Sequence, residues 1–382
     1  MNPSYPIVFY ISGHGFGHTS RTIEVIHALL HRRPDVPIIV KTSAPRLLFE
    51  RTLKGVIDVV ALSCDAGMIQ IDSLNVDTGA SVREAKAFQK EAPRLAEIEA
   101  TFLRHRGARL VVGDIPPLAF AAAASANVPS VAVGNFTWDW IYEGYPEESP
   151  SALAGDIRSM YQKATIALRL PMAGGFRGLE AITRDIPFIA RRSRQDPETV
   201  RRAIGLPARQ DGKPLILMSF GGYGIAGLDT AALAVLRDFT FATTDLPSGD
   251  HNIRPAAGVL FISEQQLYAG GLRYEDLVRA ADVVVTKPGY GIISDAIANH
   301  TALLYTSRGR FIEYDVLVRE MPRYLRAQFI ERDDLLQGNW APALEKLLSQ
   351  PPPPETPTLN GADVVAEEIL KRCKEEGRGK KE

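Results

Sequence analysis

Short apolar runs that stop at glycine-containing or polar loops, most of them followed by a helical pattern, recur along the chain. The first is PIVFYIS at residues 6–12, which leads into the loop GHGFGH and then into apolar residues at helical spacing. A continuous apolar run that ends at glycine is typical of a strand buried on both faces, as in a parallel sheet. Five similar runs follow before residue 172, and four more occur after residue 212. This alternation predicts an α/β fold with parallel sheets covered by helices on both faces.

The strand–helix scheme occurs twice, which predicts two Rossmann-like domains in tandem. A polar and charged stretch at residues 191–196 separates the two halves and is interpreted as the linker. A long helix is expected over residues 81–106, bent or broken near Pro93. A cleft is expected between the two domains. Open parallel sheets bind ligands at the carboxyl ends of their strands, so the loops at these ends are the candidates for ligand binding. The domain boundaries assigned are 1–190 for an N-terminal domain, 191–350 for a C-terminal domain, and 351–382 for a proline spacer, helix and charged tail.

The composition argues against several classes of partner and location. The chain has 44 Lys and Arg against 45 Asp and Glu, a net charge of -1, so no overall basic field exists to attract nucleic acid. Its two cysteines, Cys64 and Cys373, form no closely spaced pair, which favours a reduced, cytoplasmic protein. The first residues lack the pattern of a signal peptide, and no apolar run approaches the ~20 residues that span a bilayer. Peripheral membrane contact stays open.

Three of the predicted strands end in loops rich in glycine: GHGFGH at 13–18, SFGGYG at 219–224 and KPGYG at 287–291. Each is either a tight turn or a ligand-binding loop, and the occurrence of three at predicted strand ends favours a ligand. The first loop has His18 where the dinucleotide-binding fingerprint has its last glycine, and the chain contains no Gly-Lys-Ser/Thr sequence. These departures argue against an NAD site and against a P-loop kinase.

The KPGYG loop is the best candidate for a nucleotide site. Gly289 and Gly291 open a predicted helix whose free N–H groups would hold a diphosphate. Asp295 lies one turn further on, where it either accepts hydrogen bonds from a ribose or is a solvated residue that complements the helix dipole.

Two histidines in the first loop, His14 and His18, are candidates for a general base, and the alternative for each is a loop-ordering role. Asp114 follows the strand LVVG and either orients a histidine, binds an acceptor or caps the next helix. The aromatic segment FTWDWIYEGY at 136–145 suits either stacking against sugar rings or burial in a core.

Five segments in order, GHGFGHTSR, GDIPPLA, NFTWDWIY, SFGGYG and TKPGYGIISDAIANH, resemble the GT-B glycosyltransferases. The set is most similar to the glycosyltransferase-like domain that precedes the sugar-kinase domain in plant L-arabinokinase. It more distantly resembles the N-acetylglucosaminyltransferase that forms lipid II. The resemblance extends over roughly residues 5–329. The resemblance does not extend to the kinase half of the plant enzyme, so it does not imply kinase activity.

The resemblance implies a C-terminal helix that crosses back to the first domain, an acceptor on the N-terminal domain and a nucleotide sugar on the C-terminal domain. Lys287 stands where the plant glucosyltransferase signature has a diphosphate-binding histidine, and Asp295 stands where it has a ribose-binding glutamate. His18 matches the histidine that ends the glycine-rich loop of the lipid II enzyme. The remaining implied roles are diphosphate binding by Gly221, Gly222, Gly224, Gly289 and Gly291, donor-sugar contacts by Glu313 and Asp315, and backbone approach to the sugar by Gly13, Gly15 and Gly17.

The function expected from these observations is transfer of a sugar from a nucleotide diphosphate sugar, with UDP as the expected nucleotide, to an unknown small-molecule, lipid or glycan acceptor. The resemblance implies inversion at the anomeric carbon. Helix N-termini and Lys287 would stabilise the leaving diphosphate, so no metal or other cofactor is expected. Two alternatives stay open: a sugar-nucleotide 2-epimerase of the same fold, and a non-catalytic sensor that binds a nucleotide sugar.

Overall fold

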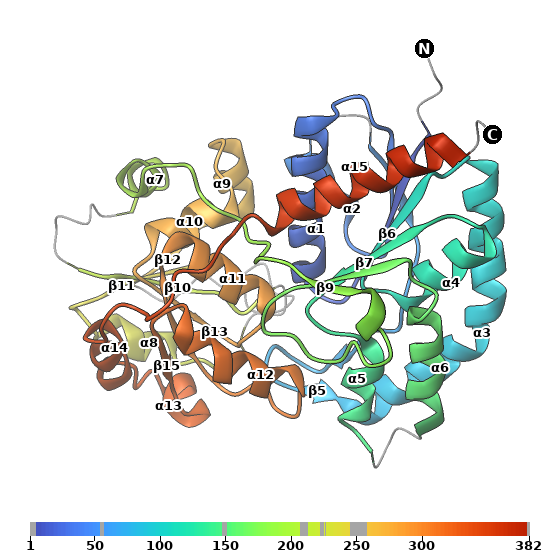
Figure 1. Ribbon diagram of the computed structural model, residues 1–382. Helices are drawn as coiled ribbons and strands as arrows, with labels where there is room; N and C mark the ends of the chain where they lie inside the picture. Colours follow the sequence, from blue (N-terminus) through green and yellow to red (C-terminus); the bar gives the residue numbers. More distant parts are fainter. Residues whose placement is uncertain are drawn as a thin grey trace. The chain divides into compact units, whose positions relative to one another are not determined.

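The chain forms two compact units, shown as a ribbon in Figure 1. The computed structural model describes residues 5–53, 57–146, 151–206, 213–221, 225, 227–244 and 258–379. Unit 1 consists of Met1–Ile69, Asp77–Ala190 and Thr358–Glu382, and unit 2 consists of Gln70–Val76 and Arg191–Pro357. Among the described residues, no helix is both long and apolar enough to cross a membrane.

Unit 1 is built on a seven-stranded sheet in the order β3-β2-β1-β6-β7-β8-β9. All of its strand pairs are parallel. The central strands are fully buried, as their uninterrupted apolar sequences predict. The strands are β1 (Ile7–Ile11), β2 (Ile38–Thr42), β3 (Ile57–Ala61), β6 (Leu110–Asp114), β7 (Ser130–Gly134), β8 (Ile166–Arg169) and β9 (Thr183–Asp185). The first six of these were predicted from the sequence, and β9 was not.

Helices cover both faces of this sheet. The helices α1, α2 and α15 form one set, in which α1 contacts the other two, while α3, α4 and α6 contact one another. The last helix runs beside the first in Figure 1, and Arg32 Nη1 donates to Asp363 Oδ1 at 2.7 Å. The expected return of the C-terminal helix to the first half is therefore confirmed. The helices are α1 (Phe16–Arg32), α2 (Arg46–Thr52), α3 (Thr78–His105), α4 (Pro117–Ser125), α5 (Trp138–Glu143), α6 (Ser151–Tyr161) and α15 (Gly361–Gly379).

The helix α3 differs from the prediction in one respect, because it continues without a break through Pro93. Pro93 lies on the exposed face of the helix, whereas Ala92 and Ala96 face the core. A proline in a helix removes one hydrogen bond, and on an exposed face water can satisfy the carbonyl that loses its partner. The apolar contacts of the other face therefore hold the helix together across this position.

Unit 2 has a six-stranded parallel sheet in the order β12-β11-β10-β13-β14-β15. The strands are β10 (Leu215–Met218), β11 (Thr240–Thr243), β12 (Val259–Phe261), β13 (Val283–Thr286), β14 (Ala302–Tyr305) and β15 (Ala327–Phe329). The sequence TFAT of β11 and AQF of β15 are too short and too polar to have been recognised as strands. The helices are α7 (Pro197–Ala203), α8 (Thr230–Ala234), α9 (Glu264–Ala269), α10 (Tyr274–Ala280), α11 (Tyr290–Asn299), α12 (Glu313–Glu320), α13 (Arg332–Gln337) and α14 (Ala341–Leu348).

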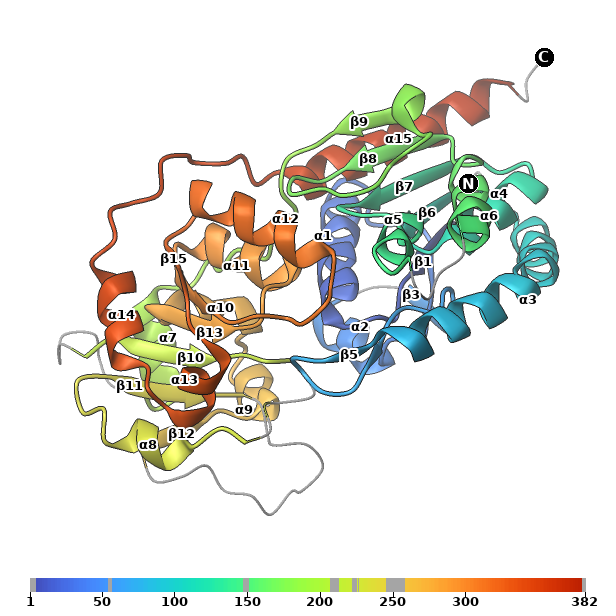
Figure 2. The same ribbon diagram turned by 90° about the horizontal axis from the view of Figure 1, so that it is seen from below.

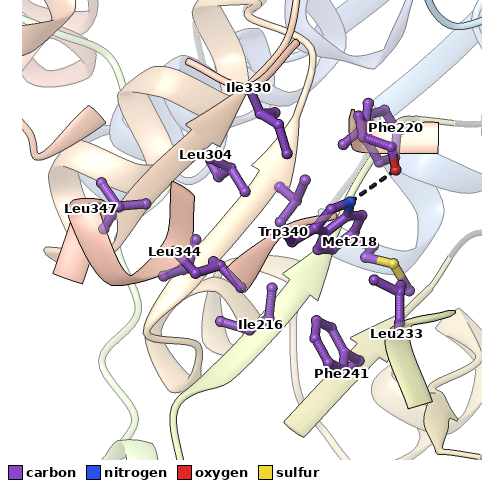
Figure 3. Close-up of a cluster of buried hydrophobic side chains, with 14 of the residues drawn as sticks. Ile216, Met218, Phe220, Leu233, Phe241, Leu304, Ile330, Trp340, Leu344 and Leu347 are labelled. Atoms are coloured by element: carbon purple, nitrogen blue, oxygen red, sulfur yellow. Dashed lines mark hydrogen bonds between the residues drawn. The ribbon is translucent and has the colours of Figure 1, made fainter. Parts of the chain in front are cut away.

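The core of unit 2 lies between one face of this sheet and helix α14. Figure 3 shows side chains of β10, β11, β14 and α14 gathered around Trp340. The indole is fully buried, and its Nε1 donates to the carbonyl of Leu335 at 2.8 Å. The same core contains Leu74, a residue that is far from the rest of unit 2 in sequence.

Leu74 belongs to a seven-residue segment, Gln70–Val76, that is part of unit 2 although the sequence on both sides of it belongs to unit 1. The chain leaves unit 1 after Ile69 and re-enters it at Asp77, and the strands β4 (Ile69–Gln70) and β5 (Val76–Asp77) pair at this crossing. Figure 2 shows β5 at this point, just before α3. From the sequence these residues were expected in the N-terminal domain, because a single buried leucine in seven residues produces no periodic pattern.

Candidate functional site

In each sheet the strand order reverses direction once, between two neighbouring strands. In open α/β sheets, ligands bind at this reversal point, outside the carboxyl ends of the two strands. In unit 1 the reversal lies between β1 and β6, and in unit 2 it lies between β10 and β13. The loop GHGFGH follows β1, SFGGYG follows β10, and KPGYG follows β13. The three glycine-rich loops singled out from the sequence therefore all flank a reversal point.

A charged cluster lies at the reversal point of unit 1. His18 Nδ1 lies 2.8 Å from Oδ1 of Asp114, the last residue of β6. The other carboxylate oxygen, Oδ2, accepts from Arg21 Nε at 2.7 Å and from Thr22 Oγ1 at 2.9 Å. Residues 18, 21 and 22 share one face of α1, because positions three and four apart are neighbours on a helix. His18 and Asp114 were expected here from the sequence, whereas Arg21 and Thr22 were not. The positions of Arg21 and Thr22, three and four residues after His18, were the signal that could have identified them.

The environment of Asp114 keeps it ionised. Burial alone would raise the pKa of this carboxyl, but the charge and hydrogen bonds of Arg21 and the hydrogen bond from His18 lower it to about 2. His18 Nδ1 lies 2.8 Å from Asp114 Oδ1 and 3.0 Å from Arg21 Nη2, and we assign a hydrogen to Nδ1 because two lone pairs would otherwise face each other across the shorter contact. Neutral His18 therefore carries its proton on Nδ1, and its Nε2 has a lone pair that can accept a proton. Pro116, and not Asp114, precedes α4 as its N-cap, so the capping role is wrong.

The second histidine of the loop has the opposite arrangement. His14 Nδ1 accepts a hydrogen bond from the backbone N–H of Met68 at 3.2 Å, which places the proton of the neutral ring on Nε2. The ring also lies against Gly67 and edge-on to Trp138, with ring centroids 5.6 Å apart. These contacts indicate that His14 orders the loop, the alternative role considered for it from the sequence.

Of the five aromatic residues at 136–145, all but the partly exposed Trp140 are buried. Trp138 is 1% exposed and stacks on Tyr142, whose hydroxyl donates to the carbonyl of Gly67 at 2.8 Å. Phe136 packs edge-on against both His18 and Trp138. Because these rings are buried, they support the loops around His14 and His18 and do not present faces to a sugar.

The local structure differs at the three glycines of the GHGFGH segment. A Cβ at Gly13 would lie 1.9 Å from Ser43 Oγ, so this glycine lets the loops after β1 and β2 come together. Gly15 has φ +72, a conformation that favours glycine, and precedes α1 with open space around the missing side chain. Gly17 lies in the first turn of α1. Only Gly15 combines a special backbone conformation with the open space that a close ligand would need.

One acidic residue of this region was missed by the sequence analysis. Asp65 follows β3 and accepts hydrogen bonds from Ser12 Oγ at 3.1 Å and from Trp138 Nε1 at 2.8 Å. Burial raises the pKa of Asp65 above its ordinary value, although both hydrogen bonds and the nearby His18 act in the opposite direction. Asp65 lies two residues after the predicted strand VIDVVALS, and this place at the carboxyl end of a strand could have identified it as a candidate.

Asp295 in unit 2 has an ionic partner that the sequence did not indicate. It is 2% exposed, and its Oδ1 accepts from the backbone N–H of Arg191 at 2.9 Å. Its Oδ2 accepts from Arg191 Nε at 2.9 Å and also from Arg191 Nη2. Burial alone would lower the pKa of Arg191, but the charges of Asp295 and Glu275 outweigh this effect and raise it. Asp295 is therefore not solvated, and its burial and pairing argue against a ribose contact.

The KPGYG loop leads into α11 as predicted. Gly289 is the N-cap of this helix, without a side-chain cap, and Gly291 lies in its first turn. Lys287 Nζ donates to Gln70 Oε1 at 3.2 Å. In the other loop, Gly221 has φ +76 with open space where a Cβ would be. Gly222 and Gly224 lie outside the described residues.

The two acidic residues expected at the donor sugar differ in their surroundings. Glu313 is buried at the start of α12, and its Oε2 accepts from Arg308 Nη1 at 3.2 Å. Arg308 Nη1 also lies 3.4 Å from the carbonyl oxygen of Pro288, which connects Glu313 to the KPGYG loop. Asp315 is exposed, and none of the described contacts connects it with these residues. Arg308 is a second cation beside this loop that the sequence analysis missed.

Within the described ranges, no group of three or more His, Cys, Asp or Glu side chains is placed to hold a metal ion.

Two parallel, doubly wound sheets in one chain, with the final helix returned to the first unit, define the GT-B fold. No protein-family model matches the chain. The chain is 28% identical over 368 residues to L-arabinokinase from Arabidopsis thaliana, in an alignment that covers 94% of this chain and 33% of that protein. It thus spans about a third of the length of this relative. The resemblance inferred from the five motifs is confirmed by this similarity and by the fold.

Solved glycosyltransferases have a similar fold. The calicheamicin glycosyltransferase CalG4 superposes with a TM-score of 0.58 and 14% identity, covering 98% of this chain and 96% of that one. UGT89C1 from Arabidopsis thaliana, solved in complex with UDP, superposes with a TM-score of 0.59 and 13% identity, covering 96% of this chain and 94% of that one. At these identities the similarity establishes the fold alone.

Proposed function

We propose that this protein is a glycosyltransferase that moves a sugar from a nucleotide diphosphate sugar, with UDP as the nucleotide, to a hydroxyl acceptor. The observation that carries the proposal is the His18–Asp114 pair at the reversal point of unit 1, joined at 2.8 Å. A histidine oriented by a buried, ionised carboxylate is suited to remove a proton from an acceptor hydroxyl. The GT-B fold and the similarity to L-arabinokinase support the same class of function.

In the proposed reaction, His18 Nε2 takes the proton of the acceptor hydroxyl as the acceptor oxygen attacks the anomeric carbon. The bond from that carbon to the diphosphate oxygen breaks, and its electron pair leaves with the diphosphate. A single displacement of this kind inverts the anomeric centre. Asp114 holds the tautomer and stabilises the imidazolium that forms, as an ionised carboxylate beside a catalytic histidine does.

The proposed donor site is the carboxyl edge of unit 2. The N–H groups at the start of α11, together with Lys287, would stabilise the charge that develops on the leaving diphosphate. Glu313 is the candidate for a contact with the donor sugar, because Arg308 connects it to the KPGYG loop. Asp295 is left out of this proposed site, since Arg191 engages both of its oxygens.

The proposal is tested first by binding and then by turnover. We expect UDP to stabilise the full chain in a thermal-shift assay, by about 2.7 kcal/mol at a hundred times its dissociation constant. UDP release is then measured with a panel of UDP-sugars, first with water and then with phenols, glycans and lipids as acceptors. Isomerisation of the sugar would instead identify an epimerase, and saturable binding without turnover would identify a sensor. Stabilisation by dTDP but not by UDP would show that the proposed nucleotide is wrong, while the proposed class, a glycosyltransferase, would stand.

Removal of divalent metal is expected to leave the transferase activity unchanged. The reason is that Lys287 and the N-terminus of α11 supply the positive charge that a metal would otherwise bring to the diphosphate. The measurement is UDP release before and after treatment with EDTA. A loss of activity that added Mg²⁺ or Mn²⁺ restores would contradict this expectation.

A further inference from the structure

The segment Gln70–Val76 lies against three loops at the carboxyl edge of the unit 2 sheet. Ser73 Oγ donates to the carbonyl of Phe220, in the loop after β10, at 2.9 Å. Gln70 accepts from Lys287, in the loop after β13. In the loop after β14, a Cβ at Gly309 would lie 3.2 Å from the carbonyl oxygen of Leu74. The segment therefore borders the reversal point between β10 and β13, where the proposed diphosphate site lies.

The segment is a fixed part of unit 2. Leu74 is 3% exposed and belongs to the hydrophobic core of this unit. Asn75 Oδ1 accepts from Arg332 Nη1 at 3.0 Å. Within the turn, Asp72 Oδ1 accepts from the backbone N–H groups of Leu74 and Asn75 at 2.7 and 2.8 Å. A buried anchor and these bonds hold Gln70 in a constant place relative to Lys287.

We propose that Gln70 is a positioning residue that directs the Lys287 ammonium toward the donor diphosphate. The ammonium has three N–H donors, and Gln70 Oε1 accepts from one of them. Because the amide is neutral, it restricts the flexible lysine without cancelling its charge. A carboxylate at this position would hold the ammonium equally well but would neutralise it and repel the diphosphate. The inference rests on the proposed function, since it assumes a diphosphate at this edge.

The experiment measures binding of UDP and of uridine by calorimetry to the full-length chain and to Gln70→Ala and Gln70→Glu. We expect the UDP dissociation constant to rise about 2–10-fold for Gln70→Ala, the range of one lost hydrogen bond. We expect a rise of about 10–100-fold for Gln70→Glu, because a new negative charge lies beside both the ammonium and the diphosphate. Uridine has no phosphate, so its affinity should stay unchanged in both variants.

The control is Gln162→Glu, which makes the same charge change at an exposed position of unit 1. A double-mutant cycle adds the positioning test: in a Lys287→Met background, Gln70→Ala should have no further effect on UDP affinity. Equal UDP affinity of Gln70→Glu and Gln162→Glu would overturn the inference, as would an equal loss for uridine and UDP. If the wild-type chain binds UDP but one of these two outcomes is found, the inference about Gln70 is wrong and the proposed function still stands. If it binds no nucleotide diphosphate, both are wrong.

Discussion

Replacement of His18 by alanine should lower kcat by about 10²–10⁴-fold, the usual contribution of a positioned general base. Its Nδ1 is engaged by Asp114, and its Nε2 is left with the lone pair that accepts a proton. The fold should survive the change, because Asp114 keeps its hydrogen bonds from Arg21 and Thr22. UDP affinity should also stay unchanged, since the proposed nucleotide site belongs to unit 2. The measurements are UDP release, UDP affinity by calorimetry, and melting temperature.

His14→Ala is the matched control, because it removes the same side chain from the loop just before α1, four residues upstream of His18. His14 uses Nδ1 to accept from the Met68 backbone, so it has no lone pair for catalysis. We expect a lower melting temperature but a kcat close to that of the wild type. Equal loss of kcat in both variants would assign an ordering role to both histidines. Full activity of His18→Ala would remove the base from this loop and make Asp65, whose pKa burial raises, the next candidate. Asp114 is a poor candidate, because its pKa is about 2.

The sequence predicts most strands of the two sheets correctly, because buried parallel strands appear as continuous apolar runs. The run IVFYI of β1 is apolar throughout, the strand VVVT of β13 is apolar up to its last residue, and both lead into glycine-containing loops. Once the fold class is recognised, strands β1 and β6 are neighbours, which brings the loop of His18 to the end residue Asp114. The pairing of these two side chains was therefore among the alternatives considered, although the sequence could not select it.

The parts that could not be predicted depend on contacts between distant residues. The choice between His14 and His18 depends on which ring nitrogen is engaged, and the partner of His14 is a backbone N–H 54 residues away. Leu74 is the buried apolar residue that places Gln70–Val76 in unit 2, since Ile71 is exposed and Val76 is only partly buried. The role of Asp295 depends on Arg191, 104 residues upstream, in a stretch that reads as a solvated linker. None of these contacts has a periodic pattern in the sequence.

Replacement of Asp295 by alanine should destabilise the protein by about 3–5 kcal/mol, the usual cost of removing one partner of a buried ion pair. The change would leave the guanidinium of Arg191 without its carboxylate, and the Arg191 side chain is only 18% exposed. It would also remove the acceptor of the Arg191 backbone N–H at the point where the chain enters unit 2. The measurement is the free energy of unfolding from urea denaturation.

Two variants make the Asp295 result specific. Asp315→Ala removes an exposed carboxylate from α12 and should change the free energy of unfolding by less than about 0.5 kcal/mol. Asp295→Asn keeps an oxygen for the backbone N–H of Arg191 but loses the charge, so its cost should lie between those of Asp315→Ala and Asp295→Ala. UDP affinity separates the two roles considered for this residue. If Asp295→Ala kept the wild-type stability but bound UDP more weakly by ~1–3 kcal/mol, the carboxylate would be a ribose ligand. Lost stability with unchanged UDP affinity of the folded fraction would establish that its partner is Arg191.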